Sequence, residues 1–304
     1  MGNYKFRNSV SSIAVLFLSG ALLSACGGSE SEKTKQSHSS PVSQSKASGP
    51  SINKAKEDEE FENRNKPLRT EMEAPELADS SNYADILTKL NPIRFYSALR
   101  SWEETDEEVA SSLKGSILVQ HDAPQLFDFE NQLNDTSDAF QKREIAQKIA
   151  AFVREDSQKV SGSYRVRMTV DAELKPYDFE THKFVSENCL FSEKLAYTAD
   201  EMRDSNTFAK AQKTRCYVQP STTNFLVGVV SGSKMDLDIP DEEIAKKIES
   251  NRAKLKYEIY GYIRYVERER LGGKPAELRH ILIEPQRINL VAAGSGKPIF
   301  SRTF

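Results

Sequence analysis

The chain of 304 residues contains little cysteine, histidine or tryptophan, and these scarcities narrow its chemistry. Its three cysteines and four histidines include neither a CxxC pair nor a compact HxxxH pair, the spacings typical of zinc sites. The formal net charge is -3, so the chain lacks the basic excess by which nucleic-acid-binding domains are recognised. We therefore expect no metal site, no cofactor and no nucleic-acid partner.

Motifs for catalysis are also missing. There is no GxSxG elbow, no HExxH helix, and no Ser-x-x-Lys with the companion motifs of penicillin-binding enzymes. The segment Gly294–Pro298 ("GSGKP") ends in proline where a phosphate-binding loop needs serine or threonine, which indicates a turn. We therefore name no catalytic residue. Acidic pairs such as Asp128 and Glu130, or Asp236 and Asp238, would need a partner carboxylate from a distant segment.

Long hydrophobic runs are scarce as well. The longest relevant run, Ile13–Ala25, covers about 13 residues, whereas a transmembrane helix needs roughly 20. Lys5 and Arg7 precede it with positive charge, and small residues follow it. This order is typical of a signal peptide, which we assign to residues 1–25.

The run ends in Leu23-Ser24-Ala25-Cys26, which resembles the lipobox of bacterial lipoprotein precursors. The resemblance implies that Cys26 receives acyl chains such as palmitate, becomes the mature N-terminus and holds the protein on a membrane of the cell envelope. Gly27 stands where an aspartate tends to retain lipoproteins in the inner membrane, so the resemblance implies the outer membrane in a cell with two membranes. An ordinary secretory signal with Ser24 and Ala25 at its cleavage site is the alternative.

Composition divides the rest of the chain into two parts. Residues 26–82 are dominated by Ser, Lys, Glu, Gln and Pro, and Phe61 is their only aromatic side chain before Tyr83. Such a segment buries too little apolar surface to offset the entropy of ordering its backbone, so we expect a disordered tether. Residues 83–304 are long enough for an ordinary hydrophobic core and form the expected globular domain.

The globular domain is predicted to be α+β, with N-terminal helices followed by a mainly antiparallel sheet and packed helices. Apolar residues recur at helical spacing over Tyr83–Leu113, with an interruption at Pro92 and a new N-cap at Thr105. Two further helices are expected. One follows a cap at Asp135, Thr136 or Ser137 and carries a stripe of Ile145, Ile149, Phe152 and Val153; the other follows Asp238, with Pro240 in its first turn.

Alternation with period two predicts the strands. The strongest signal is an antiparallel hairpin of Leu255–Tyr265 and Leu278–Val291, joined by a turn at Leu271–Pro275. The other expected strands are Ser116–Gln120, Tyr164–Val170, Arg215–Gln219, Asn224–Val230 and Pro298–Thr303.

Two cysteines remain once Cys26 carries lipid. Cys189 and Cys216 form an even pair in a compartment that permits disulfides, so we expect them to be bonded to each other. Two alternatives give Cys189 a chemical role instead of a disulfide. In them His182, seven residues earlier, is either a zinc ligand or the base of a Cys–His nucleophile pair. His280 and His121 are isolated and are read as structural.

Aromatic side chains on the hairpin supply one candidate recognition surface. Tyr260 and Tyr262 alternate with Tyr257 and Ile259, and Arg264 continues their face of the strand. An exposed tyrosine stripe among charges suits recognition of a peptide, glycan or protein. Burial of the same stripe beneath a helix is the alternative.

Together these patterns favour a membrane-anchored lipoprotein with a non-catalytic binding or scaffolding domain, whose partner is an envelope protein or glycan. An envelope hydrolase with a site assembled from distant segments, and a carrier of a lipophilic ligand, are the alternatives. Oligomeric state and ligand identity have no signature in the sequence.

The lipid anchor generates the first testable prediction. Cys26→Ser removes the only thiol that the lipobox offers, so we expect the variant to be unlipidated and released from the membrane. Mass spectrometry of the mature N-terminus is the measurement, with Ser24→Ala as a control that keeps a small residue before the cysteine. An unmodified terminus downstream of Cys26 in the wild-type protein would contradict the anchor.

Overall fold

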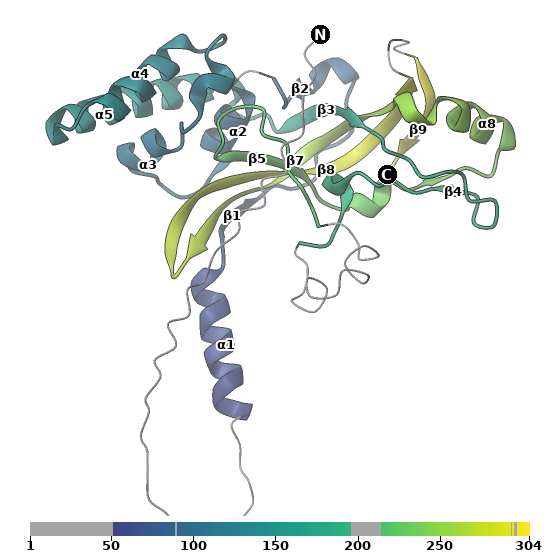
Figure 1. Cartoon of the computed structure of the whole chain (residues 1–304), viewed down its shortest axis with the longest axis horizontal. Helices are drawn as coiled ribbons and strands as arrows, with labels where there is room; N and C mark the ends of the chain where they lie inside the picture. The colour runs from purple at the N-terminus through teal and green to yellow at the C-terminus, as the bar shows by residue number, and fades with distance from the viewer. Residues whose placement is uncertain (1–50, 89, 196–213, 293, 295–296) are drawn as a thin grey trace, which may run out of the picture. The chain divides into compact units, whose positions relative to one another are not determined.

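A computed structural model describes residues 51–88, 90–195, 214–292, 294 and 297–304, which belong to one compact unit (Figure 1). Its main feature is a seven-stranded sheet with the order β2-β3-β7-β8-β5, on which β1 also pairs with β7 and β9 with β8. Only β2 with β3 and β5 with β8 are parallel. The strands are β1 (Leu68–Glu71), β2 (Ala84–Asp85), β3 (Arg165–Asp171), β5 (Phe225–Val229), β7 (Leu255–Leu271), β8 (Lys274–Ala292) and β9 (Pro298–Thr303).

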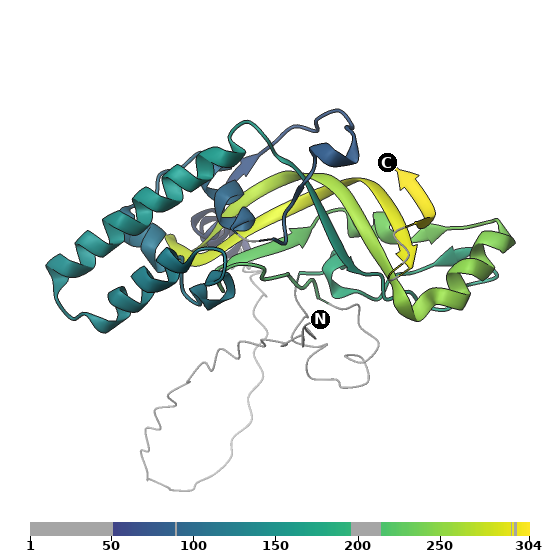
Figure 2. The same ribbon diagram turned by 90° about the horizontal axis from the view of Figure 1, so that it is seen from above.

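Helices pack at both ends of this sheet, and the fold is α+β as predicted. α2, α3, α4 and α5 gather at one end, whereas α8 and a separate pair of short strands, β4 with β6, lie at the other (Figures 1 and 2). The α-helices are α1 (Ser51–Asn65), α2 (Asn91–Leu99), α3 (Asp106–Ser111), α4 (Pro124–Asp135), α5 (Ala139–Ser157) and α8 (Glu242–Asn251). The short elements are β4 (Lys183–Phe184), β6 (Leu237–Asp238), η1 (Ser80–Asn82), η2 (Ser116–Val119), η3 (Gln158–Val160), η4 (Cys189–Phe191), η5 (Gly232–Met235) and η6 (Arg252–Lys254).

The predicted hairpin is confirmed and is longer than its sequence pattern indicated. β7 and β8 pair from Leu255 with Ala292 to Leu271 with Lys274. The two turn residues, Gly272 and Gly273, have φ angles of 58° and 86°, as tight two-residue hairpin turns require. Strand β3 pairs antiparallel with β7, and β9 with β8, so both of these predicted strands are confirmed.

Irregularities in the hairpin change which side chains face the core. The register shifts after Tyr260 and again between Ile263 and Tyr265. An extra residue in a strand reverses the alternation of its side chains. The next side chain after Ile263 to face the core is therefore that of Val266 and not that of Tyr265, and both Ile263 and Val266 are fully buried. Arg264 occupies the irregularity and reaches toward the other face of the sheet.

Several predicted helix boundaries are corrected by the structure. Pro92 lies in the first turn of α2, which begins at Asn91, instead of interrupting a longer helix, because its missing N–H leaves no helical bond unmade there. Thr105 caps α3 with the predicted side-chain bond, completed by Glu108. The cap of α5 is Asp138, one residue beyond the expected candidates, and the cap of α8 is Asp241 instead of Asp238.

Two predicted strands are absent from the described residues. Ser116–Gln120 contains the 3-10 helix η2, since Gly115 turns the chain at φ 78° and Glu130 accepts from the amides of Gly115 and Ser116. Arg215–Gln219 contributes only an isolated bridge between Val218 and Val227. Helix α4 was not predicted, because only Leu126 among its side chains is buried and its apolar stripe is correspondingly weak.

The expected tether is wrong over its second half. Residues 51–65 form α1, and Leu68–Glu71 is strand β1, paired antiparallel with β7. Asn65 accepts a hydrogen bond from the amide of Gly272 at 2.8 Å, so α1 is attached to the turn of the hairpin. Composition misled because this segment is held by strand pairing and by polar side-chain contacts, and not by fully buried side chains. The folded unit thus begins well before residue 83, and residues 26–50 lie outside the described part of the chain.

A buried cluster of charges joins the helical end to the hairpin. Glu104, in the loop between α2 and α3, lies 3.1 Å from Arg268 Nη1 and 3.2 Å from Arg279 Nη2. Its carboxylate also accepts a hydrogen bond from Tyr96 Oη at 2.8 Å, and Arg100 approaches to 3.7 Å. The side chains of Glu104 and Arg279 are 1% and 0% exposed, so each charge depends on the other for compensation.

The pKa of Glu104 reflects this balance. Burial alone raises the pKa of the carboxyl, but Arg279, Arg100, the Tyr96 hydroxyl and Arg268 together hold it below its usual value. A carboxyl whose pKa is lower in the folded than in the unfolded state stabilises the fold above its unfolded pKa, and this stabilisation is lost as the pH falls through the folded pKa.

We therefore predict that Glu104→Gln lowers the free energy of unfolding by about 3–5 kcal/mol, because it removes the counter-charge of the buried Arg279, whereas Arg268 keeps Glu108 at 3.0 Å. Urea denaturation at pH 7 is the measurement. The matched control is Glu277→Gln, whose partner Lys114 lies 4.0 Å away with both side chains largely exposed, and which should cost less than about 1 kcal/mol. Equal effects of the two substitutions would contradict a structural role for the cluster.

Candidate functional site

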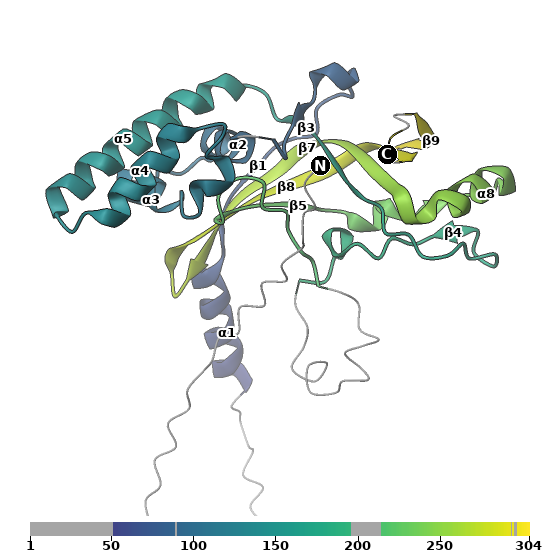
Figure 3. The ribbon, with the colours of Figure 1, turned by 45° about the horizontal axis from the view of Figure 1, so that its top comes forward.

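The strongest candidate site lies on the face of the sheet opposite the core, beneath an extended segment. Met72–Asn82, which we call the strap, connects β1 to β2 (both labelled in Figure 1) and crosses the hairpin of β7 and β8 (Figure 3). No residue of the strap is buried. Apart from Met72, which is half-buried against the core, its position therefore depends on polar contacts with the sheet.

Side chains of the sheet hold the strap by its main chain. Arg264 Nη1 donates to the carbonyl of Met72 at 2.8 Å, and the amide of Met72 donates back to the carbonyl of Arg264. Gln286 Nε2 donates to the carbonyl of Pro75 at 2.6 Å, and Arg165 donates from Nε and Nη2 to the carbonyl of Glu76. These bonds account for strap carbonyls that no strand pairing satisfies.

The end of the strap is fixed by side-chain contacts. Arg287 Nη2 donates to Ser80 Oγ at 2.8 Å, and the amide of Ala78 donates to the hydroxyl of Tyr83. Tyr83, the first residue after the strap, packs edge-on against Tyr260 with ring centroids 5.3 Å apart. Arg287 also stacks on Tyr260, with its Cζ 4.4 Å from the ring centroid.

The prediction that the tyrosine stripe is exposed is therefore wrong. Tyr260 and Tyr262 are only 5% and 4% exposed. The cover over Tyr260 includes Tyr83 and Arg287, so the burial alternative holds, although the covering segment is not a helix. Arg264, the third residue of the predicted surface, is half-buried. Its guanidinium donates to the carboxylate of Glu71 and to the carbonyl of Met72.

A pocket of ≈ 370 Å³ lies beside the strap. Its wall includes Ala74 of the strap, Tyr262 and Arg264 of β7, Glu284 of β8, Lys234 of η5 and Phe304. Two of the three residues of the predicted recognition surface therefore line this pocket, together with residues that sequence reasoning had not singled out.

Charge dominates the pocket. Lys234 is paired with Glu284, which also accepts from Ser231 Oγ at 2.9 Å. Lys234 Nζ lies 5.1 Å from the ring centroid of Phe304. Burial raises the pKa of Tyr262, so its hydroxyl stays protonated at neutral pH and can donate a hydrogen bond. The wall is thus polar, with Lys234 and Arg264 each ion-paired to a carboxylate.

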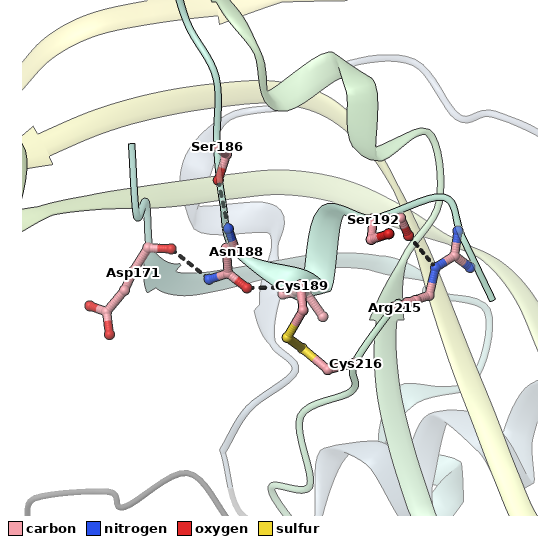
Figure 4. Close-up of a disulfide and its surroundings, with 8 residues drawn as sticks. Asp171, Ser186, Asn188, Cys189, Ser192, Arg215 and Cys216 are labelled. Atoms are coloured by element: carbon pink, nitrogen blue, oxygen red, sulfur yellow. Dashed lines mark hydrogen bonds between the residues drawn. A yellow bond between two sulfur atoms is a disulfide. The ribbon is translucent and has the colours of Figure 1, made fainter. Parts of the chain in front are cut away.

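The disulfide joins η4 to the segment that precedes β5 (Figure 4). Cys189 and Cys216 are bonded, with Cα atoms 5.3 Å apart. Asn188 caps η4 and donates to the carbonyl of Asp171, while Arg215 Nε donates to the carbonyl of Ser192 (Figure 4). Both thiols are consumed by this bond, which removes the Cys–His nucleophile and zinc alternatives that used His182.

Three of the remaining candidate residues, His280, Glu130 and Asp236, have structural partners. His280 is 5% exposed, stacks against Tyr217 at 4.8 Å, and has its pKa lowered to about 4 by burial and by Arg215. It is therefore neutral at pH 7. Glu130 is used in capping η2, and Asp236 accepts from the amide of Ser186 at 3.3 Å.

Within the described ranges, no group of three or more His, Cys, Asp or Glu side chains could hold a metal ion. Comparison with protein families, with curated proteins and with solved structures finds no match to this chain. The helices of the described part include none that is long and apolar enough to cross a membrane. Cys26 lies outside the described residues, so its lipidation stays a prediction.

Sequence reasoning missed the strap and its arginines. A signal existed in the charges: residues 71–79 contain four carboxylates and no cation, whereas arginines occur at outward positions such as Arg165 of β3 and Arg287 of β8. Complementary charges of this kind indicate a contact, but they do not say which segments meet.

The disulfide generates the third prediction. Cys189→Ala with Cys216→Ala opens a loop with a sequence separation of 27, so we expect a loss of about 2–5 kcal/mol in the free energy of unfolding. Urea denaturation with and without reductant measures it, and reduced wild-type protein is the matched control because it should show the same loss. The interpretation fails if the double variant is as stable as the oxidised wild-type protein.

Proposed function

We propose that this chain is a lipid-anchored lipoprotein of the bacterial cell envelope whose folded domain binds a partner without catalysis, at the strap and the pocket beside it. Two lines of support are independent. The lipobox at Cys26 supports a location in the cell envelope, and Gly27 supports the outer membrane where the cell has two membranes. The face that bears the strap supports binding.

One observation carries the binding proposal: sheet side chains hold an extended segment by its main-chain carbonyls. Three donors follow one another along the strap. Arg264 binds the carbonyl of Met72, Gln286 that of Pro75, and Arg165 that of Glu76. Main-chain capture of an extended chain is a general mode of peptide recognition. The same donors could serve a strand or loop from a partner.

The side chains that line the pocket favour binding of a polar partner over transport of a lipophilic ligand. A carrier of a lipophilic ligand needs an apolar cavity, whereas this wall presents Lys234, Glu284 and Arg264. A polar or anionic group of a partner fits these side chains better than an acyl chain does. The carrier function is for this reason a weaker proposal than binding of a polar partner.

The anchor and the domain would be joined by a short connection. About 24 residues separate Cys26 from α1. Twenty-four residues span at most about 80–85 Å when fully extended, at roughly 3.3–3.6 Å per residue. This is shorter than a tether ending at residue 82 would allow, so the domain would work close to the membrane surface.

Site-specific photo-crosslinking in the cells that produce the protein tests the proposal. We predict that a benzophenone side chain in place of Leu77, on the strap, or Phe304, at the pocket, yields one discrete crosslinked adduct. Both positions are accessible, at 48% and 41% exposure. The control is Phe140 on α5, which is 82% exposed and distant in the fold. Absence of adducts at Leu77 and Phe304, or equal adducts at all three positions, would contradict binding at this site.

A further inference from the structure

We propose that the strap stands in for a ligand: the sheet face beneath it binds an extended, acidic peptide segment of a partner protein, which displaces the strap. This inference rests on the proposed function and adds the chemical class of the partner. The strap is then an autoinhibitory segment, occupying in one chain the place that a second chain takes in the complex.

The contacts of the strap depend little on its side chains. The bonds from Arg264, Gln286 and Arg165 end on main-chain carbonyls, which every residue possesses. The side chains of Glu73 and Leu77 are exposed and point to no pocket that requires them. A different extended chain can therefore accept the same hydrogen bonds.

Charge selects among extended chains. Residues 71–79 carry four carboxylates and no cation, and Glu71 is ion-paired with Arg264. The face below presents Arg165, Arg264 and Arg287, whereas its carboxylate Glu284 is already neutralised by Lys234. Complementary potentials fix register and exclude like-charged partners, so an acidic segment fits and a basic one does not.

Breaking the contacts of the strap requires little free energy, but leaving the sheet face uncovered requires more. No side chain between Met72 and Asn82 is fully buried, so release breaks polar contacts that water can replace, together with the contact between half-buried Met72 and the core. The apolar surface that Met72 covers on the core would then be exposed to water. Replacement of the strap by another chain is consequently favoured over simple opening.

The test measures binding of a labelled peptide with the strap's own sequence, residues 71–80 (EMEAPELADS), to the full chain in detergent. In the wild-type protein the attached strap competes, which weakens the apparent affinity by the fraction of open molecules. Glu71→Lys with Glu73→Lys and Glu76→Lys weakens the attached strap through repulsion from the arginines. We expect this loosened variant to bind the peptide at least tenfold more tightly than the wild-type protein in fluorescence anisotropy.

Three controls define the site and the ligand class. A peptide with lysine in place of each glutamate should not bind. Adding Arg264→Gln and Arg287→Gln to the loosened variant should weaken binding at least tenfold, whereas adding Arg143→Gln, an exposed residue of α5, should leave it unchanged. Glu73→Lys with Glu76→Lys alone changes only exposed side chains, so it gives the same test if the triple variant does not fold.

Each outcome decides the inference. Equal affinity of wild-type and loosened protein, binding that survives loss of the two arginines, or equal binding of the lysine peptide overturns it. If the acidic peptide fails while Leu77 and Phe304 still yield a discrete adduct in cells, the site binds a partner of another chemistry and the proposed function stands. If both experiments fail, the proposed function fails as well.

Discussion

The pairing of β7 with β8 is the constraint on which the rest of the structure depends. β3 and β1 attach to β7, and β5 and β9 attach to β8, so every strand of the large sheet except β2 is ordered by this hairpin. The irregularities after Tyr260 and between Ile263 and Tyr265 then decide the two faces. One face packs the core and receives Glu104 from the helical end, while the other collects the tyrosines and arginines beneath the strap. The candidate site is thus a consequence of hairpin geometry.

The two faces use polar groups in opposite ways. Around Glu104 the charges are buried and mutually compensated, which makes the junction between helices and sheet rigid and costly to disturb. Beneath the strap the donors reach main-chain carbonyls at the surface, where water can replace them. Such a division places the deformable contacts on the face proposed for binding and keeps them away from the core. It also explains how a segment without buried side chains can be ordered.

Local patterns in the sequence predicted what local physics determines. The hairpin and β3 follow from period-two alternation, and the capping box at Thr105 follows from residue types three apart. β5 and β9 were also predicted, although β5 is buried along its whole length and shows no alternation. The disulfide follows from cysteine count and compartment. The strap could not be found this way, because Arg165, Arg264 and Gln286 lie 89, 192 and 211 residues from the carbonyls they bind. Its polar composition resembles that of a disordered linker, and only the folded hairpin brings its donors together.

Native-state hydrogen exchange of the full chain tests the central claim, that the strap is docked on the sheet but opens independently of it. The amide of Met72, which donates to the carbonyl of Arg264, is the most informative probe. We expect it to be protected, with an opening free energy well below that of core amides in β7 and β8. Exchange at the rate of an unstructured peptide would show that the strap is not docked, and exchange only through global unfolding would show that it cannot be displaced.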